Sequence, residues 1–356
     1  MKSFSGKRLS RQKGTRRLPT MNRLGRHNTF SEESFFLVLQ SCSSWNPFLD
    51  GSKVSEWKKT MDETAKIGNL SLLEWLHSNR PDGCSPGAID IAAGNGHMCV
   101  VEWLHANRSE GCTTRAMDCA ASNGHLHMVQ WLHRNRPEGC SYDGCSSAAH
   151  NGHHAVVEWL YFNCFEKDGN AASAALVSAA AGGHLALVEW LHPLCPLSIS
   201  ATLIMNRAAK NGHLNVIEWL YANRSRIGVD CDDQPTYGSQ YNLAIYGAAE
   251  NGHLNVVQWL HARLQHCDAR ALDVAATNGH LAVVEWLYAR HCECGQHMSY
   301  TIDSAAAGGH FSVVEWLYNI GLERFWTTRA MDEAAAIGSL PLVEWLHANR
   351  SDDYNS

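Results

Sequence analysis

The stretch ASNGHLHMVQWLH, residues 121–133, decides the fold because close variants of it recur along the chain. In each of ten copies a tryptophan follows a glycine by seven residues, and these tryptophans are Trp75, Trp103, Trp131, Trp159, Trp190, Trp219, Trp259, Trp286, Trp316 and Trp345. The first three steps between them are 28 residues long, and the later steps vary. A fixed period of this length indicates a repeat architecture in which every copy forms one supersecondary unit.

The copy at residues 113–140 predicts two short helices. The hydroxyl of Thr113 or Thr114 is suited to cap a free backbone amide of the first helix, and Asp118 is suited to the positive end of its dipole. Ala120 is followed by a second alanine, so the first helix has a face of small side chains. A neighbouring helix can approach such a face closely.

Asn123 and Gly124 end the first helix, because glycine adopts the left-handed conformation of a helix end without steric strain. The second helix carries apolar residues at the spacing of a broad buried stripe: Met128, Val129, Trp131 and Leu132. Arg136, Pro137 and Gly139 end it. A helical hairpin cannot bury this stripe alone, so the copies must stack on one another. We therefore expect each tryptophan to be buried in the layer between neighbouring repeats.

The recurring pattern A-A-x-x-G-H-x-x-V-V-x-x-L resembles the core of an ankyrin repeat, as in Ala275–Ala276, Gly279–His280 and Val283–Val284. The resemblance extends from about residue 57 to about residue 350. Where the family usually has Thr-Pro-Leu-His, this chain has Arg-Ala-Met-Asp at residues 115–118. The family period is about 33 residues, so the chain looks like a short, tryptophan-rich variant with a 28-residue period.

The resemblance implies an all-α, ankyrin-like solenoid of about ten stacked helix-turn-helix repeats. The shorter period implies that the projecting β-hairpin fingers of the family are shortened or absent. The implied stack is curved, and its concave side, lined by first helices and inter-repeat loops, binds other proteins. The expected organisation is a basic disordered tail (1–30), an N-terminal capping helix region (31–56), the ankyrin-like repeat array (57–350) and a C-terminal tail (351–356).

Positions that change from copy to copy are where a partner can be recognised, because the constant positions maintain the fold. Two such columns lie nine and two residues before the glycine of each copy. They supply the candidate partner-binding residues Lys66, Arg115, Ser122, Asp143, His150, Lys210, Glu250, Arg270, Thr277 and Tyr300. A tolerant, solvated surface explains the same variation, because one sequence does not separate drift from selection.

The longest insertion, residues 225–240, lies between Trp219 and Trp259. It contributes four further candidates, which suit a basic partner: Asp230, Asp232, Asp233 and Tyr237. A loop of this length in an array of short connections is either functional or disordered. The other enlarged joint lies between Trp159 and Trp190 and contains residues 163–172.

The N-terminal segment differs from the rest of the chain in charge. Residues 1–30 contain nine lysines and arginines and no acid, so a net charge of −6 for the whole chain leaves −15 for the remainder. A solvated tail, a nuclear-import or phosphate-binding segment and an organelle presequence all fit this composition. Residues 31–42, SEESFFLVLQSC, predict a helix that begins at a serine cap. This helix either caps the first repeat or recruits a partner.

These features predict a non-enzymatic scaffold that binds a protein partner along its concave face. The alternative is a targeting or ubiquitin-ligase-type adaptor, in which the N-terminal segment recruits machinery and the repeats select the client. Thirteen cysteines without a secretory signal indicate reduced thiols in the cytoplasm or nucleus. No apolar run is long enough to span a membrane. Self-association through the C-terminal repeat is a further expectation, because its apolar second helix lies near the end of the sequence.

No catalytic, cofactor or metal site is expected, and neither a small-molecule substrate nor a nucleic acid is expected as a partner. The sequence has no glycine-rich phosphate loop and no G-x-S-x-G motif. Cys84, Cys112 and Cys140 lie a repeat apart, too far to share one zinc ion. The cluster HCECGQH, residues 291–297, is a weak zinc pattern, because four ligands within seven residues would be strained.

Overall fold

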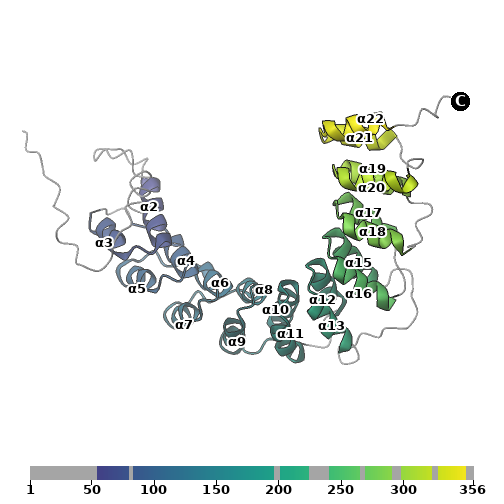
Figure 1. Cartoon of the computed structure of the whole chain (residues 1–356). Helices are drawn as coiled ribbons and strands as arrows, with labels where there is room; N and C mark the ends of the chain where they lie inside the picture. Colours follow the sequence, from purple (N-terminus) through teal and green to yellow (C-terminus); the bar gives the residue numbers. More distant parts are fainter. Residues whose placement is uncertain are drawn as a thin grey trace, which may run out of the picture. The chain divides into compact units, whose positions relative to one another are not determined.

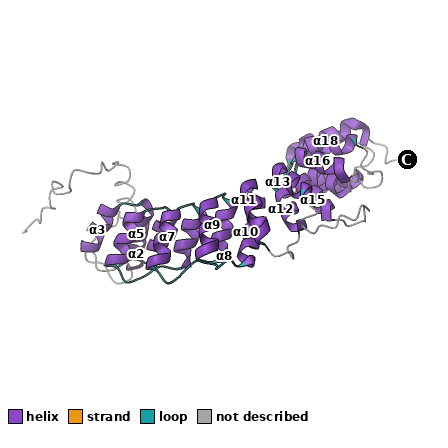
Figure 2. Ribbon diagram, turned by 90° about the horizontal axis from the view of Figure 1, so that it is seen from below, coloured by secondary structure: helices purple, strands orange, loops and turns teal. Residues whose placement is uncertain are grey.

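The computed structural model describes residues 54–79, 83–195, 201–223, 240–264, 269–290, 298–322 and 328–349. All of these residues belong to the second of two units into which the chain divides, residues 51–356. Throughout this described part every regular element is a helix, and Figure 2 contains no strand. The all-α class predicted from the sequence is therefore confirmed.

The helices follow one another in pairs, as Figure 1 shows. The first helices of the pairs are α2 (Val54–Ile67), α4 (Gly87–Gly94), α6 (Thr114–Ser122), α8 (Tyr142–His150), α10 (Gly169–Gly182), α12 (Ala201–Lys210), α15 (Gln240–Glu250), α17 (Ala269–Thr277), α19 (Met298–Ala307) and α21 (Thr328–Ala336). The second helices are α3 (Leu70–Asn79), α5 (Met98–Asn107), α7 (Leu126–Asn135), α9 (His154–Asn163), α11 (Leu185–Leu191), α13 (Leu214–Ala222), α16 (Leu254–Leu264), α18 (Leu281–Ala289), α20 (Phe311–Leu317) and α22 (Leu340–Ala348). The short turns η2 (His192–Leu194) and η3 (Tyr318–Leu322) follow α11 and α20.

The turn inside each pair has one geometry, set by the recurring glycine. In the second pair, Gly96 has a φ of 75°, in the left-handed region where a side chain would be strained. The amide of His97 donates to the carbonyl of Ala92 (2.9 Å) and the amide of Gly96 donates to that of Ala93 (3.0 Å). This is the Schellman pattern, which satisfies the free carbonyls at a helix end. The predicted role of the glycine is confirmed.

The pairs stack through their first helices. Successive first helices contact one another extensively, whereas successive second helices contact one another much less, and the extensive contacts all run within a pair or between adjacent pairs. The two adjacent alanines of the first helix, such as Ala120 and Ala121, are fully buried. Small side chains let the helix backbones come close, and the valine pair and leucine of each second helix, such as Val100, Val101 and Leu104, cover the same core.

The tryptophans lie elsewhere than predicted. We expected them to be buried, but those from Trp103 onward are partly buried at the edge of the core, and Trp75 is 43 % exposed. Each ring from Trp103 onward instead meets an aromatic residue of the preceding pair. The ring of His77 contacts that of Trp103 edge-on at 5.1 Å between centroids, and the ring of Tyr288 contacts that of Trp316 at 5.5 Å. The tryptophans therefore bridge the wider gap between second helices, while the leucine after each one occupies the core.

The joints between pairs contain no strand wherever the structure describes them, in agreement with absent fingers. Thr113 caps α6 by accepting from the amide of Arg115, as predicted. Asp118 does not act on the dipole of its own helix, because it lies beyond the first turn. Its carboxylate instead accepts hydrogen bonds from the amide and hydroxyl of Ser141, at 2.8 and 2.9 Å, and so fixes the start of the next pair.

The enlarged joint after α9 adds helix rather than loop. Only residues 164–168 separate α9 from α10, and α10 has 14 residues where α8 has nine. Asp168 caps α10 by accepting from the amide of Asn170. The fifth pair therefore supplies the hydrogen-bond acceptor for the start of its own first helix. The preceding pair has Ser146 where the second and third pairs have an aspartate. Residues 1–53, which include the predicted tail, most of the capping region and its possible recruiting helix, lie outside the described residues.

Candidate protein-interaction surface

The Asn-Gly-His turn of each pair binds the pair before it. The ring of His97 bonds through Nε2 to the carbonyl oxygen of Lys66 at 2.9 Å, and Asn95 Nδ2 donates to the same oxygen at 3.3 Å. His213 and Asn211 share the carbonyl of Ala181 in the same way, at 3.0 and 2.9 Å. These carbonyls lie in the last turn of a first helix, where intrahelical partners are missing. The recurring histidine of the Gly-His turns therefore bonds to the backbone of the preceding pair.

The same histidine ring also occupies the space beside the preceding glycine. A Cβ atom on Gly68 would lie 2.5 Å from Nδ1 of His97, and one on Gly183 would lie 2.3 Å from Nδ1 of His213. The glycine is therefore required twice, by its own backbone conformation and by the histidine of the next pair.

The joints form a second set of bonds between pairs. Glu110 accepts from Arg108 and from the amide of Cys84 (3.2 Å), and Arg108 Nη1 contacts His77 Nδ1 at 3.2 Å. Burial raises the pKa of Glu110, but the hydrogen bonds from Arg108 and the Cys84 amide outweigh it and lower that pKa to about 2. Burial and the carboxylate of Glu110 raise the pKa of the Cys84 thiol to about 11. The recurring Asn-Arg-x-Glu-Gly-Cys string is therefore structural.

These contacts do not involve the side chains of the two variable columns. The residue two before each glycine contributes its backbone carbonyl to the stack, and the residue nine before it lies two helical turns away on the same face of the first helix. Where the structure describes their side chains, most members of both columns are exposed and the others, except Gly94, are partly buried. We call this surface the first-helix face.

The structure places the candidates on described first helices as follows. Exposed side chains belong to Lys66, Arg115, Asp143, His150, Lys210, Arg270 and Thr277, whereas Ser122 and Glu250 are partly buried. Lys66 pairs with Glu63 on its own helix at 3.3 Å, and Lys210 pairs with Glu250 of the next pair at 3.0 Å. Tyr300 lies in α19. Asp230, Asp232, Asp233 and Tyr237 lie outside the described residues.

Three apolar side chains on this face were missed as candidates. Leu203 on α12 and Leu243 on α15 occupy the column nine before the glycine in successive pairs, and they are 44 % and 60 % exposed. Tyr246, one turn after Leu243, is 40 % exposed. The available signal was an apolar residue in a column that is otherwise mostly polar. Exposed apolar groups of this kind are typical anchors of protein interfaces.

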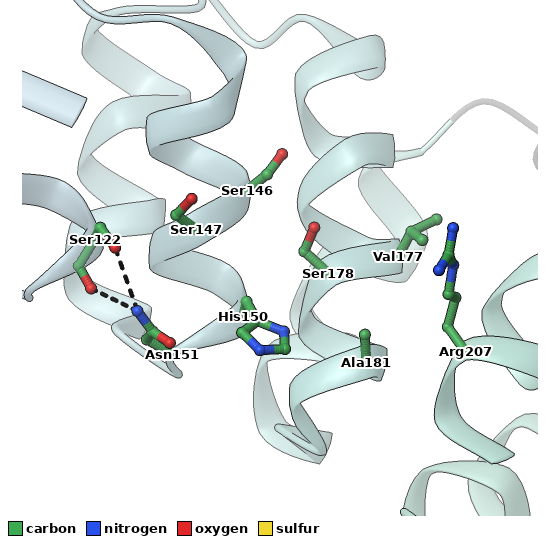
Figure 3. Close-up of a pocket in the computed structure, with 9 residues that line it drawn as sticks. All are labelled: Ser122, Ser146, Ser147, His150, Asn151, Val177, Ser178, Ala181 and Arg207. Atoms are coloured by element: carbon green, nitrogen blue, oxygen red, sulfur yellow. Dashed lines mark hydrogen bonds between the residues drawn. The ribbon is translucent and has the colours of Figure 1, made fainter. Parts of the chain in front are cut away.

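A pocket of about 440 Å³ opens on the same face (Figure 3). Its lining comes from four successive first helices and one turn: Ser122 on α6, Ser146, Ser147 and His150 on α8, Asn151 after it, Val177, Ser178 and Ala181 on α10, and Arg207 on α12. The sequence singled out only Ser122 and His150 of these. Ala181 shares the column of Ser122 and His150, whereas the other lining residues belong to neighbouring columns, and all of them meet only when four pairs are stacked.

Other kinds of site have limited support in the described part of the chain. No group of three metal-ligating side chains there is arranged to hold an ion, and the HCECGQH cluster falls outside it. No described helix has both the length and the apolar character needed to cross a membrane. In the last described pair Ile337 and Leu340 are exposed, at 49 % and 63 %, and self-association through this end stays a prediction.

Comparison with known families agrees with the geometry. A model described as ankyrin repeats (3 copies) matches residues 205–298, and a model described as ankyrin repeats (many copies) matches residues 89–133. No curated protein matches the chain. Ankyrin repeats are generally non-enzymatic modules for protein–protein interaction. The helix pairs, the Gly-His turns and both matched segments together show that this chain contains ankyrin repeats, stacked as a helical solenoid.

Proposed function

We propose that the chain is a non-enzymatic scaffold that binds a protein partner across its first-helix face. The main supporting observation is that each first helix has two sets of residues with different roles. The alanines, the glycine and the backbone carbonyls maintain the stack, while the two variable columns point their side chains outward. A surface that varies over a constant framework suits recognition of one particular partner.

The chemistry of this face supports an extended protein contact. The exposed Leu203 and Leu243 share a column with charged side chains of other pairs, such as Arg115 and Asp143, and the exposed Tyr246 lies one turn after Leu243. An apolar centre surrounded by polar groups is the usual composition of a protein interface. The cysteines of the described part are all free, which suits the reducing cytoplasm or nucleus.

The test compares two triple variants that add the same charge. The face variant combines Arg115→Glu, Leu203→Asp and Leu243→Asp, three exposed positions on first helices. The control combines Arg134→Glu, Ala155→Asp and Ala186→Asp, three exposed positions on second helices. Each full-length variant and the wild type is used to capture proteins from a native lysate, and circular dichroism verifies the helical content of all three.

The proposal predicts a protein that the wild type and the second-helix control retain and that the face variant loses. Retention by the face variant, with equal helical content, would contradict it. So would the absence of any protein that the wild type captures above the level of an unrelated repeat array.

A further inference from the structure

We propose that the pocket between α8, α10 and α12 binds one anionic group of a partner polypeptide, a carboxylate or a phosphoryl group. This inference rests on the proposed function, since it names the chemistry that the first-helix face recognises at one place. The pocket is lined by residues of four successive pairs, so an extended segment lying along the face would cross it.

The lining provides donors and one permanent positive charge. Arg207 is exposed, and within the described part its guanidinium has no ion-pair partner. The hydroxyls of Ser146, Ser147 and Ser178 likewise make no hydrogen bond to another described residue, although serines in helices often bond to their own backbone. In Figure 3 Ser178 of α10 lies between the two serines of α8 and Arg207 of α12, with His150 and Ala181 below them in this view. Free hydroxyls and a free guanidinium are the groups that bind carboxylate and phosphate.

No carboxylate is among the lining residues, although the body of the protein is acidic. The column that contributes Ser146 and Val177 to the pocket has an aspartate in the second and third pairs, Asp90 and Asp118. Those aspartates are needed to bind the start of the following pair, as Asp90 accepts from Thr113 at 2.7 and 2.8 Å. The fourth pair does not need an aspartate at this position, because Asp168 caps α10, the first helix of the following pair. The acid is therefore absent from the part of this column that lines the pocket.

Small side chains create the space. Ser147 and Ser178 occupy one column in successive pairs, and Ala181 lies one turn after Ser178. In the pair before, the same column has Cys119, against which Gly94 packs so closely that a Cβ atom would lie 2.9 Å from the Cys119 Cβ. The pocket therefore depends on the small side chains at these positions of the fourth and fifth pairs.

The position of Arg207 links the pocket to the apolar part of the face. Leu203 precedes Arg207 by one helical turn on α12, and Leu243 occupies the same column as Leu203 in the following pair. A partner segment that places its anionic group against Arg207 would bring the adjacent side chain over these leucines. This arrangement favours an acidic or phosphorylated residue next to an apolar one.

The experiment titrates the full chain with four peptides of sequence Ac-Gly-X-Leu-Gly-amide, where X is phosphoserine, aspartate, serine or lysine. Binding is followed through the amide NMR signals of Ser147, Ser178 and Arg207. Shifts of these signals locate the bound peptide, and their dependence on peptide concentration gives its affinity. The proposal predicts shifts at these amides with phosphoserine and aspartate peptides, and much weaker effects with serine and lysine peptides. The stronger of the two anionic peptides identifies the source of the anion.

Two variants test the assignment of the residues. Arg207→Gln removes the charge and is expected to weaken anionic-peptide binding about tenfold. Ser178→Leu fills the pocket and is expected to abolish the shifts while the helical content stays unchanged. Arg134→Gln, an exposed arginine on the second helix α7 and outside the first-helix face, is the control and should leave the affinity unaltered.

Equal binding of all four peptides, or an affinity that Arg207→Gln leaves unchanged, would overturn the inference. The two proposals fail separately. If the face variant loses a captured protein but Arg207→Gln binds the anionic peptides as the wild type does, the scaffold stands and the pocket does not. If the peptides bind as expected but the face variant keeps its captured protein, the pocket stands and the wider face does not.

Discussion

At the scale of the residue, the stack depends on side chains that bond to the backbone of the preceding pair. His97 Nε2 lies 2.9 Å from the carbonyl oxygen of Lys66, at a helix end that lacks an intrahelical partner. The ring also packs over Gly68. One imidazole ring thus bonds to a carbonyl and fills the space beside a glycine. These two roles explain why histidine, rather than another polar residue, recurs at this position.

Replacement of His97 by alanine should lower the free energy of unfolding by about 1–2 kcal/mol, because the Lys66 carbonyl loses the shorter of its two side-chain hydrogen bonds and the Gly68 surface loses its contact. His127→Ala is the matched control, since His127 is exposed on α7 and lies outside this column. Urea denaturation followed by circular dichroism measures both. Equal effects of the two substitutions would show that the interaction between pairs contributes nothing.

A second prediction concerns pH and the joint. The pKa of Glu110 is about 2 in the folded chain and 4.5 in the absence of its partners, so its charged form stabilises the fold above about pH 4.5. That contribution is lost as the pH falls toward 2. Glu110→Gln should therefore be less stable than the wild type at neutral pH, and the difference should shrink below about pH 4.5.

Urea midpoints of the wild type and Glu110→Gln, measured between about pH 7 and about pH 3, test this sign. Glu102→Gln serves as the control, because Glu102 is exposed on α5 and takes no part in the joint bonds that hold Glu110. A stability difference for Glu110→Gln that stays constant over this range would contradict the assigned role.

At the scale of the element, the packing of first helices sets how much side chain each position tolerates. The backbone of α10 approaches α8 so closely that a Cβ atom on Gly182 would lie 2.0 Å from the carbonyl oxygen of His150. Gly247, inside α15, has more room, because its nearest neighbour, Lys210 Cβ, would lie 3.4 Å away. Two helical glycines of the same array therefore have opposite expected responses to an added methyl group.

Gly182→Ala should destabilise the fold by about 1–3 kcal/mol, because α10 must move away from α8. Gly247→Ala should be neutral or stabilising by up to about 1 kcal/mol, because alanine loses less backbone entropy in a helix. Thermal and urea unfolding of the two variants decide the point. A comparable loss of stability in both would mean that helix separation does not limit the substitution.

At the scale of the whole molecule, the connectivity of the stack governs how stability is shared. Extensive contacts join only adjacent pairs, so the free energy is approximately a sum of terms for pairs and their interfaces. A pair with neighbours on both sides is then coupled to more of the array than one with a described neighbour on one side only. The third pair has neighbours on both sides, because α6 contacts α4 and α8, whereas the last described pair contacts α19 on one side through α21.

Leu132→Ala and Leu342→Ala each remove one buried leucine, from an interior pair and from the last described pair respectively. Each should remove about 2–5 kcal/mol locally. For Leu132→Ala, amide hydrogen exchange should become faster in α4 to α9, on both sides of the substituted pair. For Leu342→Ala, it should become faster only in the last described pair and the pair before it. A uniform increase over the whole array for Leu342→Ala would indicate a single cooperative unit and contradict the nearest-neighbour description.

The sequence by itself determined the architecture of this protein. The period, the paired alanines and the Gly-His turns predict about ten helix pairs, because helix ends and buried stripes are encoded by residues within one turn or two of each other. The cap at Thr113 followed from the same local logic. The candidate columns, where their side chains are described, fall on one face for the same reason.

Only the tertiary structure decided what lies between the pairs. The tryptophans bridge second helices at the edge of the core, Asp118 fixes the next joint, and the pocket gathers Ser147, Ser178 and Arg207 from three pairs. These relations join residues about a repeat apart. They depend on how closely neighbouring helices approach, and that distance follows from the side chains packed between them rather than from any local pattern.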